Sequence, residues 1–168
     1  MPHYHRIGNI PAKRHTQFQN PNGGLYHEQL VSTEGFSNLY STIYHNFPPT
    51  LVLQIDEPID VSPKIAAHKN MQHRCYKGFN VEPKSDFLES RKPVLVNEDV
   101  HIVLAAPKKS MKTYFYKNSD ADEVIFIHEG KGTLKTVFGE LTFGYGDYVV
   151  IPRGTIYQLE FNDEHNRL

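Results

Sequence analysis

A succession of short β-rich runs fills the chain from Val94 onward, and it restricts the possible folds more than any other feature. Each run is bounded by Gly, Pro, Asn or Asp, a pattern typical of antiparallel strands that tight turns connect. The runs cover residues 94–96, 100–105, 113–116, 124–128, 133–138, 140–143, 148–151 and 157–161. We therefore predict a meander of antiparallel strands that closes into an all-β sandwich or barrel.

Two of these runs lack alternation, and the turns between runs are rich in glycine. Apolar residues follow one another in 100–105 and 148–151, which predicts strands buried on both faces. The segments 130–132, 138–140 and 144–147 carry the glycines of tight turns, so we expect hairpin connections there.

The first half of the chain has a different character. Frequent prolines interrupt helices and central strands, because each removes a backbone donor and fixes φ. Asn20–Gly24 predicts a tight turn, and the spacing of Tyr40, Ile43, Tyr44 and Phe47 predicts a short helix that ends at Pro48. We expect residues 1–93 to form an N-terminal extension that packs on the barrel and on neighbouring domains, and 94–168 to form the barrel.

Composition limits the class of protein. The 168 residues are 39% apolar, below the ~45–50% of typical domains, and carry a net charge of −1. Such a balance gives no support to binding of nucleic acid or of an anionic membrane. The single Cys75 excludes an internal disulfide, and no apolar run approaches the ~18 residues of a membrane span. A cytoplasmic protein is expected.

Two segments together carry Glu, Gly and Pro residues at fixed spacings. The first runs from Glu123 to Gly130, and the second from Gly146 through Pro152 to Gly154. They resemble the paired motifs of the cupin superfamily. The resemblance implies a cupin-like double-stranded β-helix, or jelly roll, and the chain's end soon after the second motif predicts that this barrel is incomplete at its C-terminus.

The metal ligands of cupins are largely missing from this frame. The resemblance implies two His before the Glu and a third His after the second-motif Gly, since iron or manganese requires converging imidazole and carboxylate donors. Glu123 is retained, whereas Tyr116 and Asn118 stand in the places of the first two His and Tyr157 in the place of the third. If the gap before Glu123 is one residue shorter, Lys117 and Ser119 stand in the first two places instead. We predict that this barrel binds no metal.

A closer resemblance rests on further segments. Leu25-Tyr26-His27-Glu28-Gln29-Leu30, Arg74-Cys75-Tyr76, Phe115–Asp122 and the opening 13–18 resemble homogentisate 1,2-dioxygenase. This family resemblance implies a bicupin, in which an N-terminal barrel has lost its ligands and a C-terminal barrel holds Fe(II) with two His and one Glu. It also implies ring cleavage of homogentisate by O2 to maleylacetoacetate, in tyrosine and phenylalanine catabolism.

The resemblance further implies a trimer or hexamer. No ligand triad can be placed on this sequence, so we expect an N-terminal fragment that is inactive alone and whose partners are the C-terminal cupin half and other subunits. The alternative is a free-standing, metal-free cupin that binds a small molecule or a protein. A weaker alternative is a metallo-cupin that uses His3 and His5, or His68, His73 and Cys75; we expect these to be surface groups.

The remaining candidate residues are tyrosines and charged side chains. Tyr114, Tyr116, Tyr145, Tyr148 and Tyr157 are expected to pack in the core rather than to line an aromatic pocket. Glu123 is expected to pair with a Lys, because a buried unpaired carboxylate is costly. The cations Lys108, Lys109, Lys112 and Lys117 are expected to form a solvated edge.

Overall fold

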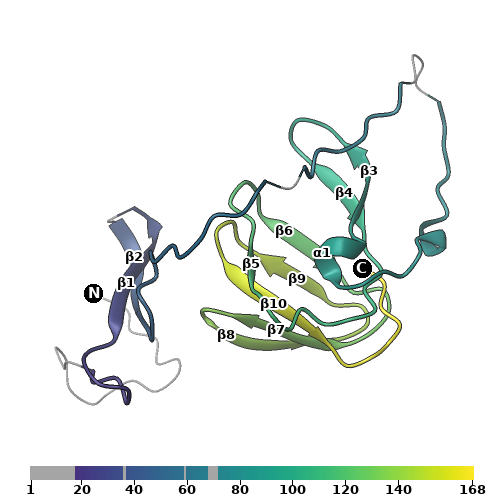
Figure 1. The fold of residues 1–168 in the computed structure, drawn as a ribbon. Helices are drawn as coiled ribbons and strands as arrows, with labels where there is room; N and C mark the ends of the chain where they lie inside the picture. The colour runs from purple at the N-terminus through teal and green to yellow at the C-terminus, as the bar shows by residue number, and fades with distance from the viewer. Residues whose placement is uncertain (1–17, 36, 59, 68–71) are drawn as a thin grey trace. The chain divides into compact units, whose positions relative to one another are not determined.

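The computed structural model describes residues 18–35, 37–58, 60–67 and 72–168. The chain divides into two compact units, Met1–Asp60 and Val61–Leu168. Figure 1 shows the strands of both units and the single short helix α1 among the described residues. The candidate site lies in the second unit.

The first unit contains one hairpin. Strands β1 (His27–Glu34) and β2 (Ser37–His45) pair antiparallel. The expected turn at Asn20–Gly24 is present: the Gly23 amide donates to the Asn20 carbonyl, and Gly23 and Gly24 both have positive φ. The short helix predicted around Tyr40 is wrong, because this segment lies within β2. Pairing with β1 bonds its backbone across the hairpin, and its aromatic and β-branched residues suit a strand.

The second unit has only short helical segments, η1 (Gly78–Asn80) and α1 (Phe87–Ser90). Asp86 caps α1, since its side chain accepts a hydrogen bond from the Glu89 amide at 3.1 Å. Among the described residues, no helix combines the length and the apolar character that crossing a membrane requires. The strands are β3 (Lys92–Val96), β4 (His101–Leu104), β5 (Tyr116–Lys117), β6 (Glu123–Phe126), β7 (Gly132–Thr136), β8 (Gly139–Phe143), β9 (Tyr148–Ile151) and β10 (Ile156–Phe161).

Six of these strands, β5 to β10, form two layers around one core, and β3 pairs with β4 in a separate two-stranded sheet. A four-stranded sheet has the order β5-β10-β7-β8, and β6 pairs with β9. Ile125 of β6 and Ile151 of β9 belong to the same buried cluster as Leu134 of β7 and Leu159 of β10. The unit is therefore all-β, as the sequence predicted, and the two layers bury their inner faces against each other.

The order of the strands corrects the expected meander. β10 lies between β5 and β7, and β6 pairs with β9 rather than with its neighbours in the chain. The turn at 138–140 does close a hairpin, between β7 and β8, but the segments 130–132 and 144–147 each connect strands of different sheets. Alternation between sheets lets consecutive strands cover opposite sides of one core.

The burial of two strands also differs from expectation. Ile102 of β4 is 51% exposed, and on β9 Tyr148 is 69% and Val150 63% exposed. In β9 one face packs on the core, so alternate side chains point outward although the sequence is continuously apolar. In β4, which pairs with β3, His101 and Ile102 are exposed and Val103 and Leu104 are half-buried. The prediction of strands buried on both faces is therefore wrong.

Candidate functional site

A hydrogen-bonded cluster joins three segments that are distant in the sequence. Glu123 begins β6, Tyr157 lies in β10, and Arg91 follows α1 as its C-terminal cap. The Tyr157 hydroxyl donates to Glu123 Oε2 at 2.6 Å, and Arg91 Nη1 donates to Glu123 Oε1 at 3.1 Å. Each oxygen of the carboxylate therefore has its own donor.

Aromatic rings enclose this ion pair. The Tyr116 and Tyr157 rings meet edge to face, with centroids 5.5 Å apart. The Arg91 Cζ atom lies 5.1 Å from the centroid of the Tyr116 ring and 5.6 Å from that of Phe87. A guanidinium over aromatic faces gains cation–π attraction, so the rings and the carboxylate together position Arg91.

Burial determines the protonation of the phenol in the cluster. Tyr157 is fully buried, and the loss of solvent raises its pKa far above the ordinary value. The hydrogen bond to the Glu123 carboxylate raises the pKa further. The hydroxyl therefore keeps its proton and acts as a donor to Glu123.

Arg91→Met is expected to lower the free energy of unfolding by about 2 kcal/mol, because it leaves the partly buried Glu123 carboxylate without its cation. Combining Arg91→Met with Glu123→Gln should cost less than the sum of the two single changes, by about 1–2 kcal/mol, since the groups interact directly. Urea unfolding followed by circular dichroism measures both quantities. Additive losses would contradict a coupled pair.

Of the positions that match cupin ligands, the structure brings together three. Tyr116, Glu123 and Tyr157 belong to the cluster, whereas Asn118 does not. The Asn118 side-chain oxygen accepts hydrogen bonds from the Asp120 and Ala121 amides at 3.0 and 3.1 Å. Asn118 thus shapes the loop that leads into β6, and Lys117, the neighbouring alternative, is exposed on β5.

The partner of Glu123 is an arginine, which corrects the expected pairing with a Lys. Arg91 lies 32 residues before Glu123, inside the segment that the sequence assigned to the extension. No local motif connects the two positions. Only the packing of α1 against the barrel brings the guanidinium to the carboxylate, so the sequence pattern gave no signal for it.

The cluster does not fit a metal ion. Both oxygens of Glu123 are taken, by Arg91 and Tyr157, and the Asn118 oxygen is held by backbone amides. A guanidinium beside the carboxylate also repels a cation, and Tyr157 retains its proton. Across the described residues, no group of three or more His, Cys, Asp or Glu is placed to hold a metal.

The histidine and cysteine candidates lie elsewhere. His3, His5 and His68 fall outside the described residues. His73 and Cys75 are exposed on the segment that precedes η1, and Cys75 is a free thiol.

The tyrosines do not converge on one pocket. Tyr157 and Tyr116 meet in the cluster, but Tyr145 and Tyr148 are 78% and 69% exposed. Tyr114 donates to Asp86 Oδ2 at 2.5 Å, and both partial burial and this bond raise its pKa. The expectation of core packing therefore holds for Tyr157 and Tyr116 and is wrong for Tyr114, Tyr145 and Tyr148, since Tyr114 is also exposed.

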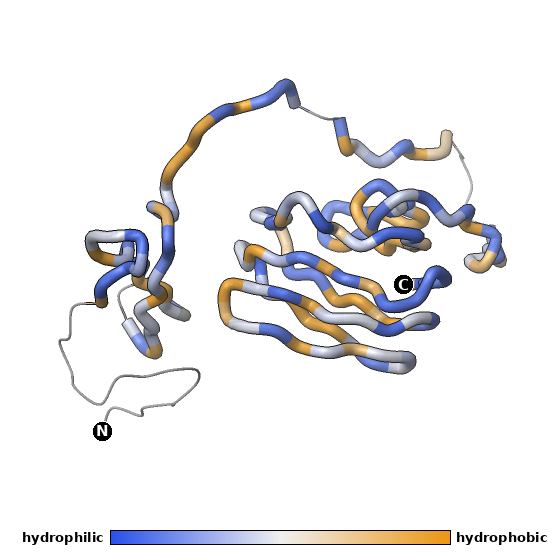
Figure 2. Tube along the Cα trace, turned by 60° about the horizontal axis from the view of Figure 1, so that its bottom comes forward, coloured by the Kyte–Doolittle hydropathy of each residue, from blue (hydrophilic) through white to orange (hydrophobic). Residues whose placement is uncertain are grey.

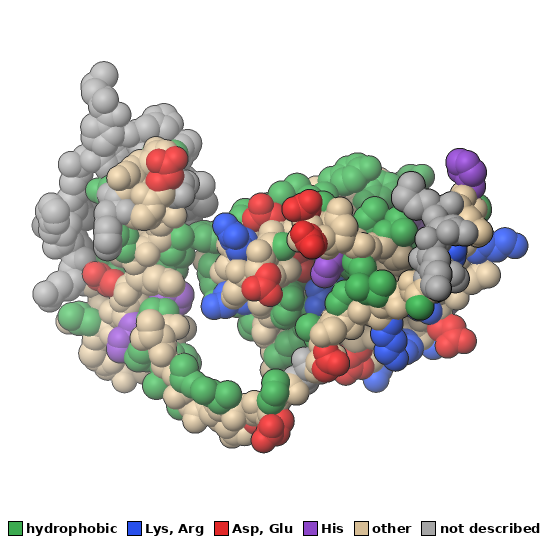
Figure 3. Space-filling view, turned by 90° about the horizontal axis from the view of Figure 1, so that it is seen from above, with side chains coloured by type: hydrophobic (Ala, Val, Ile, Leu, Met, Phe, Trp, Pro, Cys, Tyr) green, Lys and Arg blue, Asp and Glu red, His purple; other side chains and the backbone are tan. Residues whose placement is uncertain are grey.

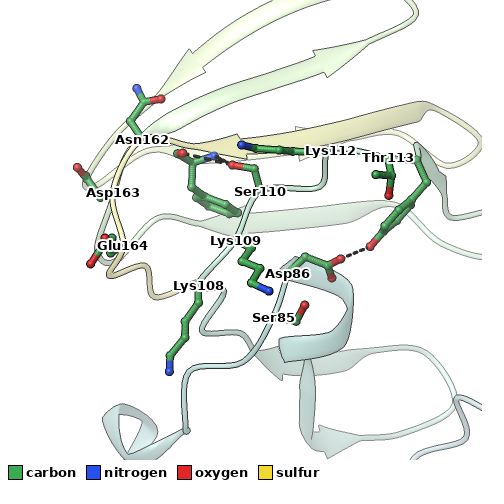
Figure 4. Close-up of a pocket in the computed structure, with 12 residues that line it drawn as sticks. Ser85, Asp86, Lys108, Lys109, Ser110, Lys112, Thr113, Asn162, Asp163 and Glu164 are labelled. Carbon is green, nitrogen blue, oxygen red and sulfur yellow. Dashed lines mark hydrogen bonds between the residues drawn. The ribbon is translucent and has the colours of Figure 1, made fainter.

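Three of the predicted lysines surround an open hollow of about 470 Å³ (Figure 4). Lys108, Lys109 and Lys112 line it together with the carboxylates of Asp86, Asp163 and Glu164. The remaining lining residues are Ser85, Ser110, Thr113, Tyr114, Phe161 and Asn162. Because charges of both signs line the hollow, it has no net charge that would select an anion, and the lysines are exposed as expected.

A comparison with known protein families gives a match over almost the whole chain. The profile of the family described as "Homogentisate 1,2-dioxygenase N-terminal" matches residues 6–168. The chain belongs to this family. The match includes the cluster and both units, so membership in the homogentisate 1,2-dioxygenase N-terminal family confirms the resemblance that the sequence motifs indicated.

Two individual proteins extend the comparison. The putative dioxygenase SSO1533 of Saccharolobus solfataricus is 36% identical over 163 residues, which cover 96% of this chain and 42% of that protein. The chain therefore spans less than half the length of this relative. A crystal structure of a cupin-2 domain containing protein from Shewanella frigidimarina matches 46% of this chain and 74% of its own, with a TM-score of 0.41 and 20% identity.

Proposed function

We propose that this chain is the structural N-terminal portion of a homogentisate 1,2-dioxygenase. The complete enzyme uses O2 to cleave the ring of homogentisate to maleylacetoacetate, a step in tyrosine and phenylalanine catabolism. The family match over residues 6–168 and the dioxygenase relative support an oxygenase of this kind. In this proposal Fe(II) binds in a C-terminal cupin half, and the complete protein is a trimer or hexamer.

The observation that carries the structural role is the cluster of Arg91, Glu123 and Tyr157. Oxygen and substrate activation by a metal requires ligands with open positions beside them. In this barrel each oxygen of the Glu123 carboxylate already accepts a hydrogen bond, and its neighbours are a cation and a protonated phenol. The same bonds tie α1, β6 and β10 together, which suits a supporting domain.

Oxygen consumption tests the proposal directly. The chain alone, given Fe(II), homogentisate and O2, is expected to show no turnover on an oxygen electrode. A chimera in which this chain replaces the matching part of the Saccharolobus solfataricus relative should consume O2 only when homogentisate is present, and should form a product with the absorbance of maleylacetoacetate.

Turnover by the isolated chain would overturn the proposal, as would stoichiometric iron that survives washing with a chelator. Reading the gene beyond the Leu168 codon provides an independent check. A downstream cupin with clustered His and Glu supports the enzyme portion. A stop codon would instead favour the free-standing binding module.

A further inference from the structure

Two histidines face each other at the open end of the hairpin in the first unit. His27 is the first residue of β1 and His45 the last residue of β2, and the two are directly opposed in the antiparallel register. Figure 2 shows hydrophilic and hydrophobic residues interleaved along this hairpin. Directly opposed residues share one face of a sheet, with Cβ atoms about 4.5–5.5 Å apart. Rotation about the side-chain bonds can therefore bring both imidazoles to one ligand.

A neighbour on the same face fixes the position of one imidazole proton. His45 Nε2 lies 2.8 Å from Gln29 Oε1. An amide oxygen only accepts hydrogen bonds, so Nε2 carries the proton and donates it, and Nδ1 keeps its lone pair. Gln29 lies two residues after His27 on β1, so the three side chains share a face. A metal-binding histidine typically donates its second ring N–H to an oxygen in this way.

The chain around this pair contains no positive side chain. No Lys or Arg occurs between Arg14 and Lys64, and the acidic residues in this interval are Glu28, Glu34, Asp56, Glu57 and Asp60. Figure 3 shows histidine and acidic side chains at the surface of the first unit. The charged residues that the structure describes in this unit are therefore all carboxylates, which produce a potential that attracts a cation.

We propose that His27 and His45 bind a divalent transition-metal ion of the class that prefers imidazole, such as Zn²⁺ or Cu²⁺. Each ring supplies one nitrogen ligand at about 2.0–2.1 Å, and water completes the coordination. Two protein ligands are fewer than a structural zinc site has, so a chelator should remove the ion. The inference does not depend on the reaction proposed above, whose test concerns iron that survives a chelator.

An ion bound from both strands closes the open end of the hairpin. The turn between Glu34 and Ser37 already connects the strands at the other end. A two-stranded hairpin is marginally stable in water, and a ligand that binds only the paired strands stabilises the pairing by mass action. Saturating Zn²⁺ should therefore slow hydrogen exchange of the backbone amides of β1 and β2, and should leave the exchange of β7 and β10 unchanged.

Isothermal titration of the full chain with Zn²⁺ tests the site. The background chain carries His3→Ala, His5→Ala and Cys75→Ser, so that these other candidate ligands do not contribute. In this background His27→Ala and His45→Ala should each weaken binding at least about tenfold, because a chelate loses the effective concentration of its second ligand. With half an equivalent of Cu²⁺, electron paramagnetic resonance should show coupling to two imidazole nitrogens in the background chain and to one in each variant.

Further variants separate this arrangement from the mere number of histidines. His27→Ala/Leu30→His keeps the number but places the new ring opposite Thr42 on the other face, so it should bind as weakly as His27→Ala. Gln29→Leu removes the acceptor for His45 and should weaken binding about tenfold, whereas Gln29→Glu should restore it. His73→Ala, at an exposed histidine of the second unit, should leave the affinity unchanged.

Three results would each overturn the proposal. The first is no binding to the background chain up to about 1 mM Zn²⁺, the weak end of specific affinities. The second is equal affinity in the background chain and in either His27→Ala or His45→Ala, and the third is tight binding by the variant with His at position 30. Without metal, every variant should show the amide exchange of the background chain; His27→Asn and His45→Asn, which stay polar, replace an alanine variant that does not.

Discussion

Tyr157→Ala should lower the free energy of unfolding by about 4 kcal/mol, one of the two largest single-residue effects that we expect. The side chain is fully buried, contacts the core, and provides one of the two donors to Glu123. Removal of a buried aromatic ring leaves a cavity and typically costs about 3–5 kcal/mol. Urea unfolding monitored by far-UV circular dichroism measures the loss.

Two companion variants separate packing from hydrogen bonding. Tyr157→Phe keeps the ring and removes only the hydroxyl, so it should cost about 1–2 kcal/mol through the lost donor to Glu123. Tyr145→Ala, at a residue 78% exposed, should change stability by less than about 0.5 kcal/mol. Equal losses for Tyr157→Phe and Tyr157→Ala would show that the ring contributes nothing, contrary to the packing described here.

Gly132→Ala should destabilise the barrel by about 3 kcal/mol or more, because β7 and β10 approach too closely there for a side chain. A Cβ atom at this position would collide with the Glu160 carbonyl oxygen and lie 2.8 Å from the Phe143 ring. The first contact is with backbone in a paired strand, which cannot move without breaking the ladder. Thermal and urea unfolding measure the effect.

Gly144→Ala provides the matched control for this variant. Gly144 also lies in the second unit, but a Cβ atom there would meet nothing within 4 Å and its φ is not in the left-handed region. It should therefore be neutral or slightly stabilising. A loss of similar size in both variants would mean that glycine itself, rather than the close approach of strands, determines the cost.

Local pattern predicted the positions of most strands but not their partners. The run 148–151 coincides with β9, and 133–138 and 157–161 overlap β7 and β10. Periodicity and turn residues act over a few neighbours, so they are visible in one sequence. The pairing of β10 between β5 and β7 depends on contacts between distant residues, which no local signal specifies.

The same limit applies to the cluster. Tyr116, Glu123 and Tyr157 were found because they occupy positions of a spaced motif. Arg91 was missed because it reaches Glu123 only through the packing of α1. The helix predicted around Tyr40 failed for a related reason: spacing by three and four residues also occurs in a strand, and only pairing with β1 determines which structure forms.

The place of β10 has a consequence for synthesis on the ribosome. This strand is the last of the four-stranded sheet in the chain, yet it lies in the interior of that sheet. Until residues 156–161 leave the exit tunnel, the β7–β8 hairpin exposes its inner edge and β5 has no neighbour. The nascent polypeptide must therefore remain protected from aggregation until β10 has emerged and inserted between β5 and β7.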